Sequence, residues 1–310
     1  MTIIDSKIDR VTTAVLLAAG TGSRLQPLTD DAPKCLTEIN GVTILERQLH
    51  GLRQQGFRRL VVVLGYLGEC IREFLVDHAA GLTVDYVTNP RYRTTNNLYS
   101  LWLARKEVRE PFLLVECDLV FDMSLLGDML YPDKIAVSHR RAWMNGTTVT
   151  LDPFQRVTTV QVGGSAIADD FSYKTVNICS LSVASWQRVH ERLTRRVLAG
   201  RVNEYYEAVF ADMVADGSLS FDAVFFDPDR WHEVDTLGDL RECERLFSIH
   251  PDRIPHRVSI ATSGTRTFRR IPQSRTSPFA AVGAVPNSQR EKLDPGDQSA
   301  IAKKHDLPRL

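Results

Sequence analysis

A short glycine-rich string near the N-terminus carries residue types that bind phosphate. Residues 19–23, Ala-Gly-Thr-Gly-Ser, follow an apolar run, and their small side chains let consecutive backbone N–H groups close around phosphate oxygens. Arg24 can donate a forked pair of hydrogen bonds to phosphate, and Lys34 supplies a compact positive charge for an α-phosphate. The spacing predicts a site for a ligand that carries several phosphate groups.

Two common phosphate-binding motifs are absent from this string. A dinucleotide fingerprint requires a third small residue, but Leu25 stands at that position. The Walker pattern Gly-x-x-x-x-Gly-Lys-Ser/Thr does not occur. These observations argue against both a hydride-transfer enzyme and a Walker-type ATPase.

Three acidic residues form a candidate metal site. Asp118 follows an apolar strand-like run, and ligands of open α/β sheets gather at the carboxyl ends of strands. Glu233 and Asp235 stand two positions apart, which places them on one face of an extended segment. Mg²⁺ prefers such oxygen ligands. The alternative makes Asp118 a turn residue and Asp235 a helix cap, although a capping box at residues 236–239 can begin the last helix without Asp235.

The second half of the chain contains residues suited to a smaller second substrate. Aromatic rings and carboxylates can surround an organic cation, and the candidates are Trp143, Tyr173, Tyr205, Tyr206, Asp169 and Asp170. Lys174 instead favours an anionic group such as phosphate, phosphonate or carboxylate, and Asn145 can add hydrogen bonds. Ordinary core packing is the alternative for each aromatic residue, so both interpretations stay open.

Strand-like and helix-like stretches alternate through the first half, a pattern typical of a doubly wound sheet. The expected strands there are residues 11–18, 59–66, 82–87 and 112–118, with helices at 44–55, 68–79 and 96–108. In the second half, short strand-like runs are followed by helices near 185–198 and 204–215. We therefore predict an α/β fold with a Rossmann-like, doubly wound mixed sheet and a small hairpin-rich acceptor-binding layer.

Composition separates the chain into a body and a tail. The net charge of the 310 residues is zero, but residues 251–310 hold 11 Lys and Arg against 5 Asp and Glu, together with 7 of the 14 prolines. We predict a leader at residues 1–10, one domain at 11–250 with acceptor-side elements at about 134–230, and a disordered basic tail at 251–310. The acidic body disfavours nucleic acid as a partner.

Cysteine usage and the N-terminus indicate a cytoplasmic protein without a membrane partner. The five cysteines are scattered and form no Cys-x-x-Cys pair, which argues against a disulfide framework and a thiolate zinc site. The first apolar run is too short for a membrane span, and no basic segment with a cleavage site precedes it.

Two strings resemble a known family. The string LAAGTGSRL…PLT…PKCL resembles the signature of the sugar-phosphate and related nucleotidyltransferases. The string TTNNLYSLWLA at residues 94–104 is similar to the phosphocholine cytidylyltransferase branch, which includes enzymes acting on phosphonates such as 2-aminoethylphosphonate. The resemblance covers roughly residues 12–248 and implies metal ligation by Asp118, Glu233 and Asp235.

The expected function is Mg²⁺-dependent transfer of CMP from CTP to a small phosphorylated or phosphonylated acceptor, with release of pyrophosphate. We expect Lys34, Arg24 and Asp118 to act in catalysis. Expected nucleotide contacts are Leu17, Ala18, Ala19, Gly20, Thr21, Gly22, Ser23, Asn96 and Ser100, and expected acceptor contacts are Trp143, Asn145, Tyr173 and Lys174. Two alternatives stay open: a sugar-1-phosphate uridylyl- or thymidylyltransferase, and a catalytically silent nucleotide-binding regulatory protein.

Overall fold

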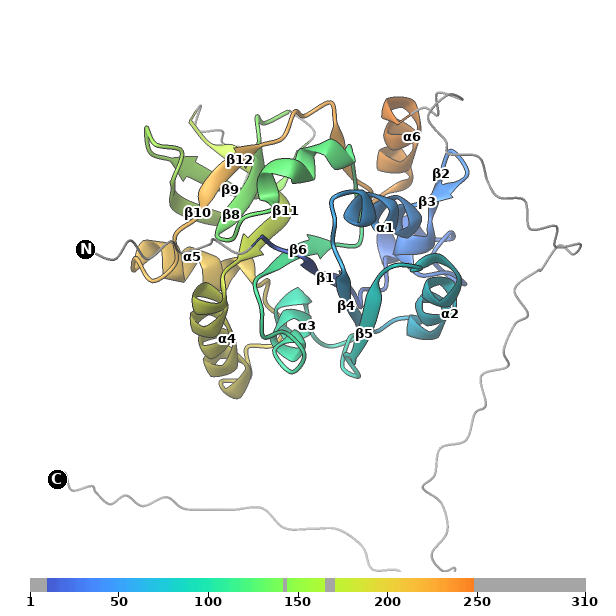
Figure 1. The fold of residues 1–310 in the computed structure, drawn as a ribbon, viewed down its shortest axis with the longest axis horizontal. Helices are drawn as coiled ribbons and strands as arrows, with labels where there is room; N and C mark the ends of the chain where they lie inside the picture. The colour runs from blue at the N-terminus through green and yellow to red at the C-terminus, as the bar shows by residue number, and fades with distance from the viewer. Residues whose placement is uncertain (1–9, 142–143, 165–170, 248–310) are drawn as a thin grey trace, which may run out of the picture. The chain divides into compact units, whose positions relative to one another are not determined.

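A mixed β-sheet with helices on both faces forms the centre of the protein (Figure 1). The computed structural model describes residues 10–141, 144–164 and 171–247. In these residues the main sheet has nine strands, and its path runs β10-β9-β11-β6-β1-β4-β5. Off this path, β8 pairs with β11, and β12 pairs with β8. The parallel half contains β1 (Thr13–Ala18), β4 (Arg59–Leu64), β5 (Thr83–Thr88) and β6 (Phe112–Glu116).

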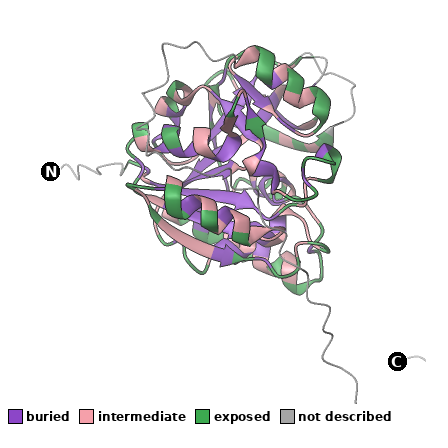
Figure 2. Cartoon of the chain, turned by 90° about the vertical axis from the view of Figure 1, so that its right-hand side faces the viewer, coloured by how far each residue is buried: buried purple, intermediate pink, exposed green. Residues whose placement is uncertain are grey.

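The helices cover the two faces as a doubly wound fold requires. They are α1 (Ile44–Gln54), α2 (Gly68–His78), α3 (Asn97–Ala104), α4 (Val183–Leu198) and α5 (Glu207–Ala215). The last helix, α6 (Leu237–Leu246), packs in a separate, smaller core cluster. Leucines of α1 and α2 pack with one face of β1 and β4 in one core cluster. Apolar residues of α3, α4 and α5 pack with the other face in a second cluster. Figure 2 shows the buried strands between partly exposed helices. The predicted fold class is confirmed.

The antiparallel half continues the same sheet. Its strands are β8 (Lys134–Ser138), β9 (Gly146–Leu151), β10 (Val157–Gly164), β11 (Tyr173–Leu181) and β12 (Asp222–Phe225). The long strand β11 pairs antiparallel with β9 at its start, with β8 between Lys174 and Cys179, and with β6 at its end. The predicted hairpin is β9–β10, and it extends the main sheet because β9 pairs directly with β11.

A separate two-stranded ladder joins residues far apart in the sequence. β7 (Leu119–Phe121) pairs antiparallel with β13 (Trp231–Glu233), and Leu119 lies opposite Glu233. The backbone N–H of Val234 donates to the carbonyl of Asp118 at 2.9 Å. A smaller hairpin is formed by β2 (Glu38–Ile39) and β3 (Val42–Thr43). The ladder therefore brings Asp118 beside the late acidic residues.

Several local expectations can be compared with the structure. The capping box of Thr236 and Asp239 is present and begins α6, so Asp235 is not its cap. The helix expected at 96–108 ends earlier, at Ala104, and Asn96 caps it by accepting a hydrogen bond from the next backbone N–H. The five cysteines are free thiols. In the described part of the chain, every helix is too short or too polar to cross a bilayer. Residues 1–9 and the predicted tail lie outside the described residues.

Candidate active site

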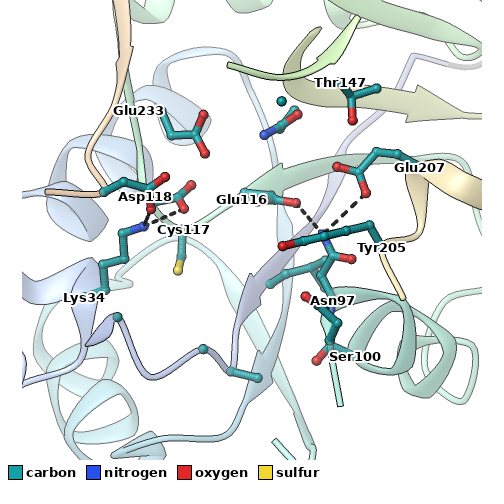
Figure 3. A pocket seen from close by; sticks show the side chains of 18 of the residues that line it. Lys34, Asn97, Ser100, Glu116, Cys117, Asp118, Thr147, Tyr205, Glu207 and Glu233 are labelled. Atoms are coloured by element: carbon teal, nitrogen blue, oxygen red, sulfur yellow. Dashed lines mark hydrogen bonds and ion pairs between the residues drawn. The ribbon is translucent and has the colours of Figure 1, made fainter. Parts of the chain in front are cut away.

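One cavity of about 440 Å³ opens where the carboxyl ends of β1 and β6 meet the antiparallel half (Figure 3). Its walls come from the glycine-rich loop after β1, the start of α3, the end of β6, β9, β11, α5 and β13. The cavity thus combines first-half and second-half elements, and Figure 3 shows Lys34 and Asp118 at one end and Asn97 and Glu207 at the other.

The glycine-rich loop is shaped by Gly22. This residue has φ of +63°, a left-handed conformation that favours glycine. A Cβ atom there would lie 3.1 Å from the Cβ of Lys34 and 3.1 Å from Cγ2 of Thr29. The hydroxyl of Thr29 donates to the carbonyl of Gly22 at 2.8 Å. The turn therefore packs closely over the residues that position Lys34.

Lys34 lies among carboxylates at the centre of this end of the cavity. Its Nζ donates to Oδ2 of Asp118 at 2.8 Å and to Oδ1 of Asp235 at 2.5 Å, and Arg24 contacts the same Asp235 oxygen at 2.8 Å. Burial opposes the charge of Lys34, but the two carboxylates outweigh it and raise its pKa well above the ordinary value. Lys34 is therefore a buried, permanently charged group.

Asp118, Glu233 and Asp235 fit a divalent cation. Each offers a carboxylate oxygen, and these oxygens lie within 4.8 Å of one another. Oδ1 of Asp118 is buried and has no hydrogen-bond partner among the described residues. Burial and the charge of Asp118 raise the pKa of Glu233 to about 7. A hard cation would satisfy the orphaned oxygen and offset the repulsion, as oxygen-seeking Mg²⁺ does in comparable sites.

The opposite end of the cavity contains a second cluster of polar side chains, which the sequence did not predict. Nδ2 of Asn97 donates to Glu116 at 3.0 Å and to Glu207 at 3.5 Å, while its Oδ1 accepts from the backbone N–H of Tyr206 at 3.0 Å. Burial, together with the charges of Glu116 and Glu207, raises the pKa of the Tyr206 phenol. Burial raises the pKa of both Glu116 and Glu207. This end is therefore rich in buried hydrogen-bond acceptors.

Lys174 enters the cavity from β11. It is 3% exposed, and its Nζ donates to the carbonyl of Thr175 at 2.5 Å. The ammonium lies 5.9 Å from the ring centre of Trp231, which begins the strand that carries Glu233. The charge of Lys174 also acts on Glu207 and Glu233. Because its printed hydrogen bond among the described residues uses one N–H, the ammonium retains donors for an anionic group.

Most sequence-predicted site residues line the cavity. Those that line it are Leu17, Ala19, Gly20, Gly22, Ser23, Arg24, Lys34, Asn96, Ser100, Asp118, Asn145, Lys174, Glu233 and Asp235. Trp143, Asp169 and Asp170 lie outside the described residues. Tyr205 lines the cavity, whereas Tyr206 is buried in the core.

Three predicted contact residues lie elsewhere, for reasons of backbone geometry. Ala18 and Tyr173 each precede a cavity residue on an extended segment, and successive side chains point to opposite faces. Ala18 accordingly packs in the core with α1 and α2. The ring of Tyr173 contacts Phe225 and His139 on the other face of the sheet. Thr21, between the two loop glycines, is not among the lining residues.

Some cavity residues were missed although a signal was present. Asn97 belongs to the Asn-Asn string already singled out, and Glu116 stands two positions before Asp118. Alternation along the strand expected at residues 112–118 places Glu116 and Asp118 on the same side. Glu207 gave no signal because it follows two tyrosines in an ordinary helical pattern.

Comparison with known proteins identifies the fold and the domain. Residues 14–141 match the model of the MobA-like NTP transferase domain. The chain is 35% identical over 256 residues to the CMP-5'-(3-aminopropyl)phosphonate synthase of Streptomyces rubellomurinus, covering 79% of this chain and 40% of that protein. It is 31% identical over 116 residues to the choline-phosphate cytidylyltransferase of Streptococcus pneumoniae, covering 37% of this chain and 49% of that protein. The chain therefore spans less than half the length of these two relatives.

A solved structure has the same architecture. The CTP:phosphocholine cytidylyltransferase of Streptococcus pneumoniae superimposes with a TM-score of 0.66 at 21% identity, covering 76% of this chain and 99% of that one. This likeness shows the fold, and the matched domain contains the glycine-rich loop, Lys34 and Asp118. Residues 14–141 thus match a MobA-like NTP transferase domain, and the chain is similar to nucleotidyltransferases in sequence and in fold.

Proposed function

We propose that this protein transfers the CMP group of CTP to a small phosphorylated or phosphonylated acceptor, releases pyrophosphate, and requires Mg²⁺. The observation that carries the proposal is the position of Lys34 between Asp118 and Asp235, directly behind the glycine-rich loop. Phosphate-binding amides, a buried cation and three carboxylates share one cavity. The printed names of the relatives, which include cytidylyltransferases for phosphonate and phosphocholine substrates, support the choice of nucleotide and acceptor.

The carboxylates of Asp118, Glu233 and Asp235 would hold the metal. Mg²⁺ there would supply positive charge against the phosphate oxygens. The glycine-rich loop and Arg24 would bind the β- and γ-phosphates through N–H groups. Lys34 would stabilise the negative charge that develops at the α-phosphate, and Asn96 and Ser100 would contact the ribose and base.

The reaction follows from this arrangement. An acceptor phosphate or phosphonate oxygen attacks the α-phosphorus of CTP, a new P–O bond forms, and the bond to the bridging oxygen of pyrophosphate breaks. The attacking oxygen is already ionised near neutral pH, because the second pKa of a phosphate monoester is about 6. The protein therefore has to position the reactants and neutralise charge. This reaction does not require a general base.

The test is pyrophosphate release by the purified full chain with Mg²⁺ and each of the four common nucleoside triphosphates. The acceptors are phosphocholine, aminoalkylphosphonates and sugar 1-phosphates. Release with CTP and a phosphonate or phosphocholine supports the proposal. Release only with UTP or dTTP and a sugar phosphate replaces it with the uridylyl- or thymidylyltransferase alternative, and binding of CTP without any release favours the silent regulatory protein.

A further inference from the structure

The distribution of charge along the cavity is uneven. At one end Lys34 and Arg24 oppose Asp118 and Asp235. At the other end Glu116 and Glu207 meet at a single amide, the Nδ2 of Asn97. Because one neutral amide cannot supply donors to all four carboxylate oxygens, this end retains capacity for a cationic donor.

Asn97 fixes the geometry of this end. Its side chain bridges α3 to the segment that begins α5, and two backbone hydrogen bonds flank it: Asn96 N–H to Val202 O at 3.0 Å and Leu98 N–H to Glu204 O at 3.3 Å. Tyr205 and Glu207, on either side of the bonded Tyr206, both line the cavity. These hydrogen bonds therefore attach the segment with Tyr205 and Glu207 to α3.

We propose that Glu207, with Glu116 and positioned by Asn97, forms a subsite for the primary ammonium group of the acceptor, which makes the acceptor a zwitterionic aminoalkyl phosphonate or phosphate. This inference rests on the proposed function. Lys174 and the Lys34 end attract the anionic group, so the acceptor lies with its ammonium toward Glu207. Lys174 already exerts its positive charge on Glu207. A neutral polyol acceptor adds no further cation for the two buried carboxylates, whereas an ammonium group does.

A primary ammonium fits this subsite better than a quaternary one. Quaternary ammonium groups are recognised by several aromatic faces, since they have no N–H donors. Among the described residues, the aromatic side chains that line the cavity are Tyr92 and Tyr205, too few for a cage of several aromatic faces. Three N–H donors can instead bond to carboxylate oxygens of Glu207 and Glu116.

The test compares two acceptors that differ only in the amine, 3-aminopropylphosphonate and propylphosphonate, in the full chain and in Glu207→Gln. Wild type is expected to prefer the amine by at least about 100-fold in kcat/KM, because a site with buried polar groups rejects a ligand that leaves them unpaired. Glu207→Gln should lower this ratio at least about tenfold, chiefly through KM for the amine. The trimethylated analogue should be used at least about tenfold less well than the primary amine by wild type.

Glu204→Gln is the matched control. Glu204 lies three residues before Glu207, pairs with Arg196 and Arg201, and does not line the cavity. It should keep the amine preference of wild type. Equal losses for both phosphonates in Glu207→Gln, no amine preference in wild type, or equal use of the trimethylated analogue would each overturn the proposal.

Calorimetry separates this inference from the proposed function. Binding of the two phosphonates is measured in the presence of Mg²⁺ and a CTP analogue with a methylene bridge between the α- and β-phosphorus. If no acceptor supports pyrophosphate release but the amine still binds at least about tenfold more tightly, and Glu207→Gln removes that difference, the subsite stands while the transfer activity fails. Equal binding of the two phosphonates overturns the subsite, whether or not the protein is active.

Discussion

The ammonium of Lys34 lies 2.5 Å from a carboxylate oxygen of Asp235, a residue 201 positions later in the chain. Lys34 also contacts Asp118, so one buried cation neutralises two of the three proposed metal ligands. A lysine in this position and a divalent cation compete for the negative charge of the same two carboxylates. The pair therefore links the charge state of the site to the presence of metal and nucleotide.

Substitution of Lys34 should distinguish its effect on catalysis from its effect on metal binding. Lys34→Ala is expected to lower kcat/KM at least about 100-fold, because a charge that stabilises the transition state is lost. The same variant should bind Mg²⁺ more tightly in the absence of nucleotide, since the competing ammonium is gone. Steady-state pyrophosphate release and Mg²⁺-dependent shifts in melting temperature measure the two effects. Full activity in Lys34→Ala would remove Lys34 from the mechanism.

Removal of a carboxylate should raise the metal requirement. Asp235→Asn is expected to increase the Mg²⁺ concentration for half-maximal pyrophosphate release at least about tenfold, because one charged oxygen ligand is lost. Asp229→Asn is the control, since this acid is exposed and pairs with Arg141 outside the cavity. The two variants are compared by Mg²⁺ titration at saturating CTP. An unchanged Mg²⁺ dependence in Asp235→Asn would contradict the metal site.

The two loop glycines should differ in their tolerance of alanine. Gly22→Ala is expected to lower the free energy of unfolding by about 1–2 kcal/mol, because φ is positive and the new methyl group presses on Lys34 and Thr29. At Gly20 no described atom lies within 4 Å of the position of a Cβ. Gly20→Ala should therefore unfold at nearly the wild-type denaturant concentration. Equal losses in both variants would show that the left-handed turn is not what requires Gly22.

An ion pair at the other end of β1 predicts a pH dependence of stability. Arg59 contacts Glu110 at 2.5 Å and Thr13 donates to the same oxygen at 2.8 Å. Although burial opposes the charge, these hydrogen bonds lower the pKa of Glu110 below its ordinary value. The ionised carboxylate therefore stabilises the fold above the unfolded-state pKa, and this contribution is lost as the pH falls through the folded-state pKa.

Glu110→Gln should accordingly lower the melting temperature at pH 7, and the difference from wild type should shrink below about pH 4. Thermal unfolding of both proteins between pH 3.5 and 7 measures the difference. Glu107→Gln, three residues earlier and without a side-chain ion pair among the described contacts, is the control. A difference that is constant across this range would mean that charge on Glu110 does not contribute.

The sequence predicted the elements better than it predicted side-chain direction. Hydrophobic runs located β1 and β11 but did not show which side chains point to which face of the sheet. The structure shows that Leu17 and Lys174 face the cavity, while Ala18 and Tyr173 face away from it. Glu207 was missed for a different reason. Its neighbours in space, Asn97 and Glu116, are 110 and 91 positions away, and only the placement of the second half against the first brings them together.

The ladder between β7 and β13 determines when the site can be completed during synthesis. A nascent chain already contains the glycine-rich loop, Lys34 and Asp118 once its first half has left the ribosome. The other two acids arrive more than a hundred residues later and reach Asp118 through pairing of β13 with β7. A translation product that stops before residue 231 therefore carries the phosphate loop without the carboxylate cluster, and competence to bind metal is acquired late and in a single pairing event.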